Sequence, residues 1–113
     1  MKVSDRLEKE EWYTLRARRL FEAILLLQNE EECAIFFRDL LTLDELAEIS
    51  TRWQVALEIL AGKKVREITQ SLGVSSATVS RIRQWLKDGK GGYRLVLARI
   101  RYLEEATKNG GSS

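Results

Sequence analysis

The stretch VREITQSLGVSSATVSRIRQW, which runs from Val65 to Trp85, decides the fold that we expect for this chain. Apolar residues recur in it at helical spacing on both sides of one glycine: Ile68 and Leu72 before Gly73, Val79 and Ile82 after it. Gly73 can adopt the positive φ of a tight turn without strain. The pattern predicts a helix-turn-helix over about residues 65–87, in which two short helices share a small core.

The outward face of the second helix in this stretch suits the major groove of duplex DNA. Its side chains are short at the N-terminal end and longer beyond it: Ser75, Ser76, Ala77, Thr78, Ser80, Arg81 and Gln84. Arg81 can make two hydrogen bonds to guanine, and Gln84 can do the same with adenine. Lys63, Lys64 and Arg66 flank the first helix and can hold phosphates, which fixes the register without reading the sequence.

The rest of the chain also predicts helices, and therefore an all-α fold. No proline interrupts them. The expected helices run from Ser4 or Asp5 to about Leu27, from the polar break at 28–32 to Leu41, from a capping box of Thr42 and Glu45 to about Ala61, and from Tyr93 to Ala106. We expect one domain over residues 1–108 and a disordered tail at 109–113.

The first helix predicts a second subunit. Its later part is apolar over much of its circumference, through Leu20, Phe21, Ile24, Leu25 and Leu27. Such a helix must be buried on more than one side. In a chain of 113 residues the expected cover is a second copy, and hence a homodimer.

The charges are divided unevenly along the chain. Residues 1–50 carry 7 Lys/Arg and 12 Asp/Glu, whereas residues 51–113 carry 12 Lys/Arg and 5 Asp/Glu. A basic half next to an acidic half indicates a face for an acidic partner, and nucleic acid is the first candidate.

The composition argues against catalysis, metal binding and secretion. The chain has no histidine and a single cysteine, Cys33, so the usual zinc ligand sets and the commonest general base are missing. We expect no catalytic residues, no metal and no cofactor. A lone cysteine fits a reducing cytoplasm. The N-terminus has no apolar core of signal-peptide type, and the run Ala23–Leu27 is too short to span a membrane.

From Leu40 to Leu86 the sequence resembles the bacterial tryptophan repressor family, and within it the YerC/YecD group of related proteins. The resemblance is carried by Leu41-Thr42-Leu43-Asp44-Glu45, Thr51-Arg52, Glu58-Ile59-Leu60, Gly62, Arg66-Glu67, Leu72-Gly73 and Ala77-Thr78-Val79-Ser80-Arg81. It implies an intertwined helical homodimer that represses transcription at palindromic operators. It also implies a bacterial cytoplasmic protein associated with the nucleoid.

The resemblance further assigns a ligand pocket, from which this sequence departs. Arg52 matches the arginine that stacks on the indole of L-tryptophan, and Arg81 matches the one that meets its carboxylate. Leu41 and Thr42 match contacts from the partner subunit. Ile82, however, stands where the family has glycine, and Trp85 stands where it has serine. We expect both to fill the pocket, so that L-tryptophan is not a co-repressor and any other effector is unknown.

These departures leave open what Arg52 does. It can stack on Trp85 or on Trp53, or it can pair with an acidic residue.

We therefore expect a sequence-specific, dimeric DNA-binding regulator. The alternative is a non-specific DNA-binding or protein-interaction module on the same fold, because Ser75, Ser76 and Ala77 offer few strong base contacts. An enzyme of the transposase or recombinase type would need a clustered set of acidic residues. The acidic residues here lie mostly in the N-terminal helices and the polar breaks.

Overall fold

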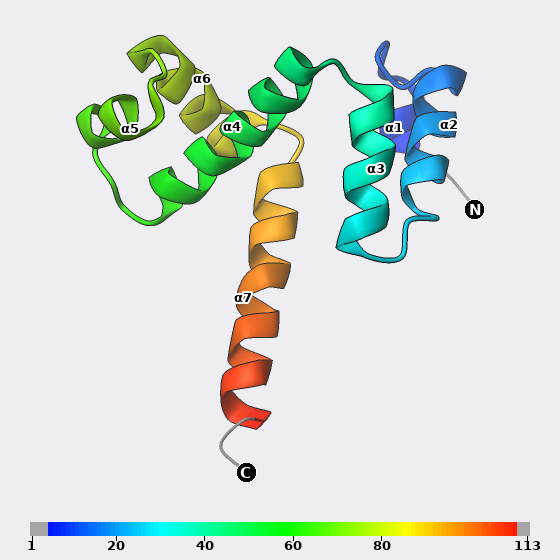
Figure 1. Cartoon of the computed structure of the whole chain (residues 1–113). Coiled ribbons are helices and arrows are strands. Elements are labelled where there is room, and N and C mark those ends of the chain that lie inside the picture. Colours follow the sequence, from blue (N-terminus) through cyan, green and yellow to red (C-terminus); the bar gives the residue numbers. More distant parts are fainter. Residues whose placement is uncertain (1–4, 111–113) are drawn as a thin grey trace. The chain divides into compact units, whose positions relative to one another are not determined.

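The computed structural model describes residues 5–110, and over that range it contains helices and turns but no strand (Figure 1). The helices are α1 (Asp5–Glu8), α2 (Leu15–Ile24), α3 (Glu30–Leu40), α4 (Leu43–Leu60), α5 (Val65–Leu72), α6 (Ser76–Asp88) and α7 (Gly92–Gly110). The predicted all-α fold is confirmed. None of the helices in the described range is both long and apolar enough to cross a membrane.

The chain packs as two compact units, Met1–Leu46 and Ala47–Ser113, whose boundary falls inside α4. The sequence predicted a single domain over residues 1–108. Burial differs between the two units: every buried residue in the described range lies between positions 55 and 86, whereas no described side chain from 6 to 46 is buried.

The N-terminal helix differs from the prediction. Instead of one helix to Leu27, the chain forms α1 and then restarts at α2. Thr14 is the reason, because its backbone is extended and its Oγ1 accepts a hydrogen bond from the Ala17 N–H at 3.1 Å. A threonine in this position starts a new helix rather than continuing the old one. The alternative predicted cap, Ser4, lies outside the described residues.

Two other helix starts follow from side-chain capping. Asn29, inside the predicted polar break, begins α3, where its Oδ1 accepts a hydrogen bond from the Glu32 N–H at 2.9 Å. The predicted capping box before α4 is confirmed: Thr42 Oγ1 accepts from the Glu45 N–H at 3.1 Å, and Glu45 Oε1 accepts from the Thr42 N–H at 2.9 Å. These bonds lower the pKa of the Glu45 carboxyl, because the backbone and hydroxyl groups of Thr42 favour its charged form.

The last helix is longer than predicted. We expected it to end near Ala106, but α7 continues to Gly110. Its final turns are rich in glutamate, alanine and lysine, which favour helix, and no proline stops it. Asn109 and Gly110 are thus helical rather than part of the predicted tail, and 111–113 lie outside the described residues.

The core of the second unit joins α4, α5 and α6, which lie beside one another in Figure 1. Its buried apolar side chains are Val55 and Ala56 from α4, Ile68 from α5, and Val79, Ile82 and Leu86 from α6. Leu72 and Val74 are partly buried against this cluster. The apolar pairs that the sequence placed on either side of Gly73 therefore do meet in one core.

The turn between α5 and α6 has the predicted glycine geometry. Gly73 ends α5 with φ 66° and ψ 28°, and its N–H donates to the Thr69 carbonyl at 3.0 Å. Ser75 then begins α6, with its Oγ accepting from the Thr78 N–H at 3.1 Å. The helix boundaries predicted for this segment are confirmed.

Replacing Gly73 tests this turn. A Cβ at Gly73 would meet no atom within 4 Å, so the cost of Gly73→Ala is conformational and not a clash. We expect it to lower the free energy of unfolding by about 1–2 kcal/mol, measured by urea denaturation at fixed protein concentration. Gly73→Asn is the control and should cost less, because asparagine tolerates the left-handed conformation. Equal stability of the alanine variant and the parent would contradict this account of the turn.

Candidate nucleic-acid interface

The outward face of α6 lies where the sequence predicted it. Of its predicted residues Ser75, Ser76, Ala77, Ser80, Arg81 and Gln84 are exposed, and Thr78 is half-buried. Ser75 and Thr78 are already engaged, because their hydroxyls lie 3.0 Å apart and Ser75 caps the helix. The unengaged short side chains at the helix tip are therefore Ser76, Ala77 and Ser80.

The two long side chains predicted to read bases differ in their surroundings. Gln84 donates a hydrogen bond from its amide to the Asp88 carboxylate one turn later. Arg81 is exposed and has no ion pair or hydrogen bond with any described residue. Gln84 must leave Asp88 before it can contact adenine, whereas Arg81 needs no such exchange.

Two exposed cations on α6, Arg83 and Lys87, were missed by the sequence analysis. They continue a stripe that begins at Ser76 and Ser80, at intervals of four, three and four residues along one side of the helix. Arg81 and Trp85, four apart, lie along a different stripe. The same helical spacing that revealed the core positions could have identified Arg83 and Lys87.

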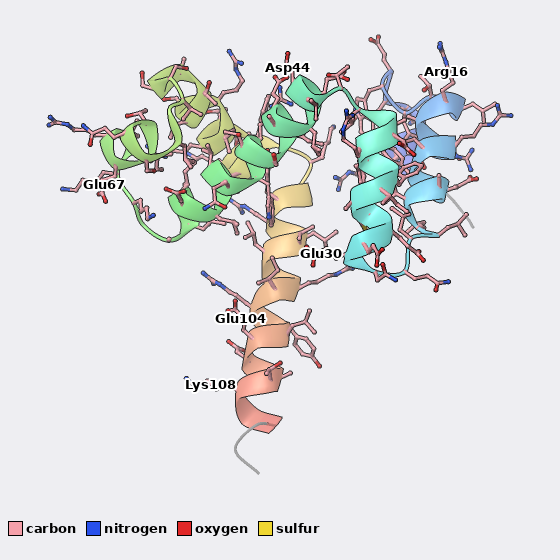
Figure 2. All side chains as sticks on the ribbon, in the orientation of Figure 1. Arg16, Glu30, Asp44, Glu67, Glu104 and Lys108 are labelled. Atoms are coloured by element: carbon pink, nitrogen blue, oxygen red, sulfur yellow. The ribbon has the colours of Figure 1, made fainter. Side chains whose placement is uncertain are left out.

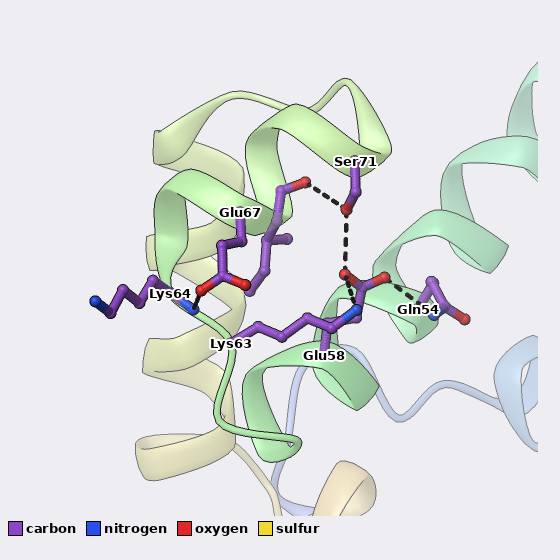
Figure 3. Close-up of polar contacts among 7 residues, drawn as sticks. Gln54, Glu58, Lys63, Lys64, Glu67 and Ser71 are labelled. Atoms are coloured by element: carbon purple, nitrogen blue, oxygen red, sulfur yellow. Dashed lines mark hydrogen bonds and ion pairs between the residues drawn. The ribbon is translucent and has the colours of Figure 1, made fainter.

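The cations that precede and begin α5 are exposed, as predicted, but are not equivalent. Lys63 places its Nζ 3.3 Å from Glu58 Oε1, while Lys64 points away from that group (Figure 3). The Lys64 backbone N–H donates to Glu67 Oε1 at 3.2 Å, which fixes the first turn of α5. Arg66 is exposed on that first turn.

A buried carboxylate, Glu58, ties these segments together and was not predicted as a functional residue. It accepts hydrogen bonds from the Gln54 amide at 3.0 Å, the Lys63 ammonium at 3.3 Å and the Ser71 hydroxyl at 3.2 Å (Figure 3). The Gln54 bond, followed by those of Lys63 and Ser71 and the Lys63 charge, lowers the Glu58 pKa despite the opposing effect of burial. The signal in the sequence was a single acidic residue inside the apolar stretch Val55–Leu60.

Arg52, which the sequence analysis matched to a ligand pocket, is engaged with other side chains of the second unit. Arg52 Nη2 lies 2.8 Å from Glu48 Oε1, and the Arg52 guanidinium lies 6.0 Å from the centre of the Trp85 ring. Of the three partners left open for Arg52, it contacts two: an acidic residue, Glu48, and the ring of Trp85. Trp53 stacks instead on Tyr93, with ring centres 6.1 Å apart and planes 5° apart.

Ile82 and Trp85 occupy different environments. Ile82 is 1% exposed and belongs to the core, whereas Trp85 is 40% exposed. Trp85 also lines a hollow of about 690 Å³, together with Trp53, Tyr93 and the turn after α6. The remaining matched residues, Leu41 and Thr42, belong to the first unit: Thr42 is held in the capping box and the Leu41 carbonyl accepts from Arg38 Nη1 at 3.1 Å.

Comparison with known proteins agrees with the resemblance seen in the sequence. The family model described as Trp repressor protein matches residues 16–101. The uncharacterized protein YerC of Bacillus subtilis (strain 168) is 36% identical over 86 residues, which cover 76% of this chain and 83% of that protein.

Two solved structures share the fold. A candidate Trp repressor from Staphylococcus aureus matches with a TM-score of 0.75 and 40% identity, over 87% of this chain and 96% of that one. A TrpR-like protein from Eubacterium eligens ATCC 27750 matches with a TM-score of 0.73 and 34% identity, over 77% of this chain and 90% of that one.

The lowered pKa of Glu58 predicts how stability depends on pH. A carboxyl whose pKa is lower in the folded state stabilises the fold above its unfolded pKa, and this contribution is lost as the pH falls. We expect Glu58→Gln to lower the free energy of unfolding near neutral pH, and its difference from the parent to shrink between about pH 5 and pH 3. Urea titrations across this range measure the difference, with the exposed Glu105→Gln as control. A difference that stays constant with pH would contradict the account.

Proposed function

The chain belongs to the Trp repressor family, and from that premise we propose that it is a sequence-specific DNA-binding regulator that represses transcription as a homodimer. In this proposal α5 and α6 form the helix-turn-helix, and α6 enters the major groove. The observation that carries the proposal is the exposed face of α6. Its side chains are short at the N-terminal end of the helix and cationic beyond it, and a buried core holds the helix.

The dimensions of α6 suit this role. At about 1.5 Å per residue, Arg83 lies about 10 Å and Lys87 about 16 Å along the helix from Ser76. The major groove is about 8.5 Å deep, so a helix that inserts its tip brings these two cations to the level of the phosphates. Ser76, Ala77 and Ser80 then face base edges, and the longer side chains of Arg81 and Gln84 form hydrogen bonds with bases. Lys63, Lys64 and Arg66 add phosphate contacts from the other helix.

A homodimer is supported by the apolar surface that a single chain leaves uncovered. The exposed large apolar residues include Trp12, Leu15, Phe21, Leu25, Leu26, Ile35 and Leu40 in the first unit, and Leu95, Val96, Tyr102 and Leu103 on α7. Figure 2 labels Glu104 and Lys108 on the C-terminal part of α7, where every described side chain from 101 to 108 is exposed. Surfaces of this kind mark protein interfaces. A two-fold dimer would space its two reading helices about 34 Å apart, one turn of B-DNA.

Regulation without L-tryptophan is supported by the state of the matched pocket residues. Arg52 is paired with Glu48 and lies over Trp85, and Ile82 fills core volume where the family has glycine. A ligand would have to displace these contacts, and overpacking an occupied site costs about 1–3 kcal/mol or more. We therefore propose that α6 keeps its DNA-binding position without this co-repressor, in the bacterial cytoplasm at the nucleoid.

Charge removal tests the DNA interface. Arg83→Gln and Arg66→Gln should each weaken binding to all duplexes by a similar factor, and should each lower the slope of log affinity against log salt by about 0.9. Fluorescence anisotropy with labelled duplexes of several sequences measures both quantities. Lys9→Gln removes the same charge from an exposed site in the first unit and should change neither.

The same assay separates residues that recognise bases from residues that only contact phosphates. Arg81→Ala should reduce the preference among sequences by about 1–3 kcal/mol at one position. If no variant alters the preference while all weaken binding, the alternative of a non-specific DNA-binding module is correct.

A calorimetric titration tests the proposal that L-tryptophan does not bind. We expect no binding heat when L-tryptophan is added to the parent protein. Trp85→Ser restores the family's serine but leaves Ile82 in place, so it should remain unresponsive as well. A micromolar dissociation constant for the parent would contradict a filled pocket.

A further inference from the structure

Burial of the Glu58 carboxylate in this core carries a free-energy cost. Its side chain is 8% exposed, and a buried carboxylate destabilises a protein unless its charge is paired and hydrogen-bonded. An apolar residue of similar size would often serve stability equally well. The three donors that satisfy it come from three consecutive parts of the chain: Gln54 in α4, Lys63 in the turn and Ser71 in α5 (Figure 3).

Lys63 is held to Glu58 at both ends. Its backbone N–H donates to the Glu58 carbonyl at 3.1 Å, and its Nζ lies 3.3 Å from Glu58 Oε1. The Lys63 side chain is 46% exposed, whereas the Glu58 side chain is 8% exposed. An ammonium has three N–H donors, and Glu58 is bonded to one of them. The remaining donors can take a phosphate oxygen from the solvent side.

The same carboxylate fixes α5. The bond from Ser71 Oγ holds the C-terminal half of α5 to Glu58, thirteen residues earlier. One carboxylate thereby bonds both to Lys63 and to the helix whose first turn carries the other cations. A cation whose position is fixed before binding loses less freedom when it meets its partner than a free lysine does.

We propose that Glu58 is a positioning residue for DNA binding, which holds the Lys63 ammonium at the corner between α4 and α5 so that it meets one backbone phosphate. This inference rests on the proposed function and assigns a role to a residue that would not itself touch DNA. The opposite effect, in which Glu58 withholds Lys63 from phosphate, is disfavoured by burial: three donors surround the carboxylate, while nearly half of the Lys63 side chain is exposed.

A double-mutant cycle tests the proposal through DNA affinity. Lys63→Gln should weaken binding to every duplex several-fold and lower the salt slope by about 0.9. Glu58→Gln should shift both quantities in the same direction, and the double variant should be no weaker than the weaker single variant, because both remove one contact. Ser71→Ala removes only the hydrogen bond between α5 and Glu58, and it should leave the salt slope unchanged. Losses that multiply in the double variant, or a gain in affinity from Glu58→Gln, overturn the proposal.

A second measurement needs no DNA. The ¹⁵N relaxation of the Lys63 ammonium should report a restrained group in the free parent protein and a mobile one in Glu58→Gln. Lys64 serves as the internal reference, because its side chain points away from Glu58 (Figure 3). A Lys63 ammonium as mobile as that of Lys64 in the parent overturns the proposal even if DNA is bound. A parent that binds no duplex overturns it together with the proposed function, whereas binding with multiplied losses overturns it alone.

Discussion

The burial of six apolar side chains from α4, α5 and α6 is the constraint on which the rest of this structure depends. Val55, Ala56, Ile68, Val79, Ile82 and Leu86 form the buried cluster, and no other apolar residue in the described range reaches their degree of burial. Helices of 8 and 13 residues are marginal on their own, so packing is what holds α5 and α6 in shape. The turn at Gly73 and the cap at Ser75 then fix how the two helices follow one another.

The same cluster links the fold to the proposed mode of regulation. Ile82 contributes to the core, and the sequence resemblance matches it to a glycine of the family. In our proposal, this one side chain both helps to orient α6 and closes the space for a co-repressor. Arg52 pairs with Glu48, and its guanidinium lies over the Trp85 ring. In our account the chain replaces a regulated contact with a permanent internal one.

The parts of the structure that follow local rules could be predicted from the sequence. The helix pair around Gly73, the capping box of Thr42 and Glu45, and the exposure of the α6 face all depend on spacing and on short-range hydrogen bonds. The break before α2 also depends on a local cap, Thr14. It was not predicted, because apolar residues recur at helical spacing on both sides of Thr14. Glu58 could not be assigned, because its partner Ser71 lies thirteen residues away and only the fold brings them together. The engagement of Gln84 by Asp88 was equally open, since exposed side chains choose among several partners.

The central claim, that α6 of a dimer reads DNA sequence without a co-repressor, is tested most directly by selection from a random duplex pool. The purified full chain is used at near-physiological salt with no ligand added. Our account predicts enrichment of one inverted repeat whose half-sites are centred about one helical turn apart. Enrichment of no sequence, with binding that is equal across the pool, would contradict it.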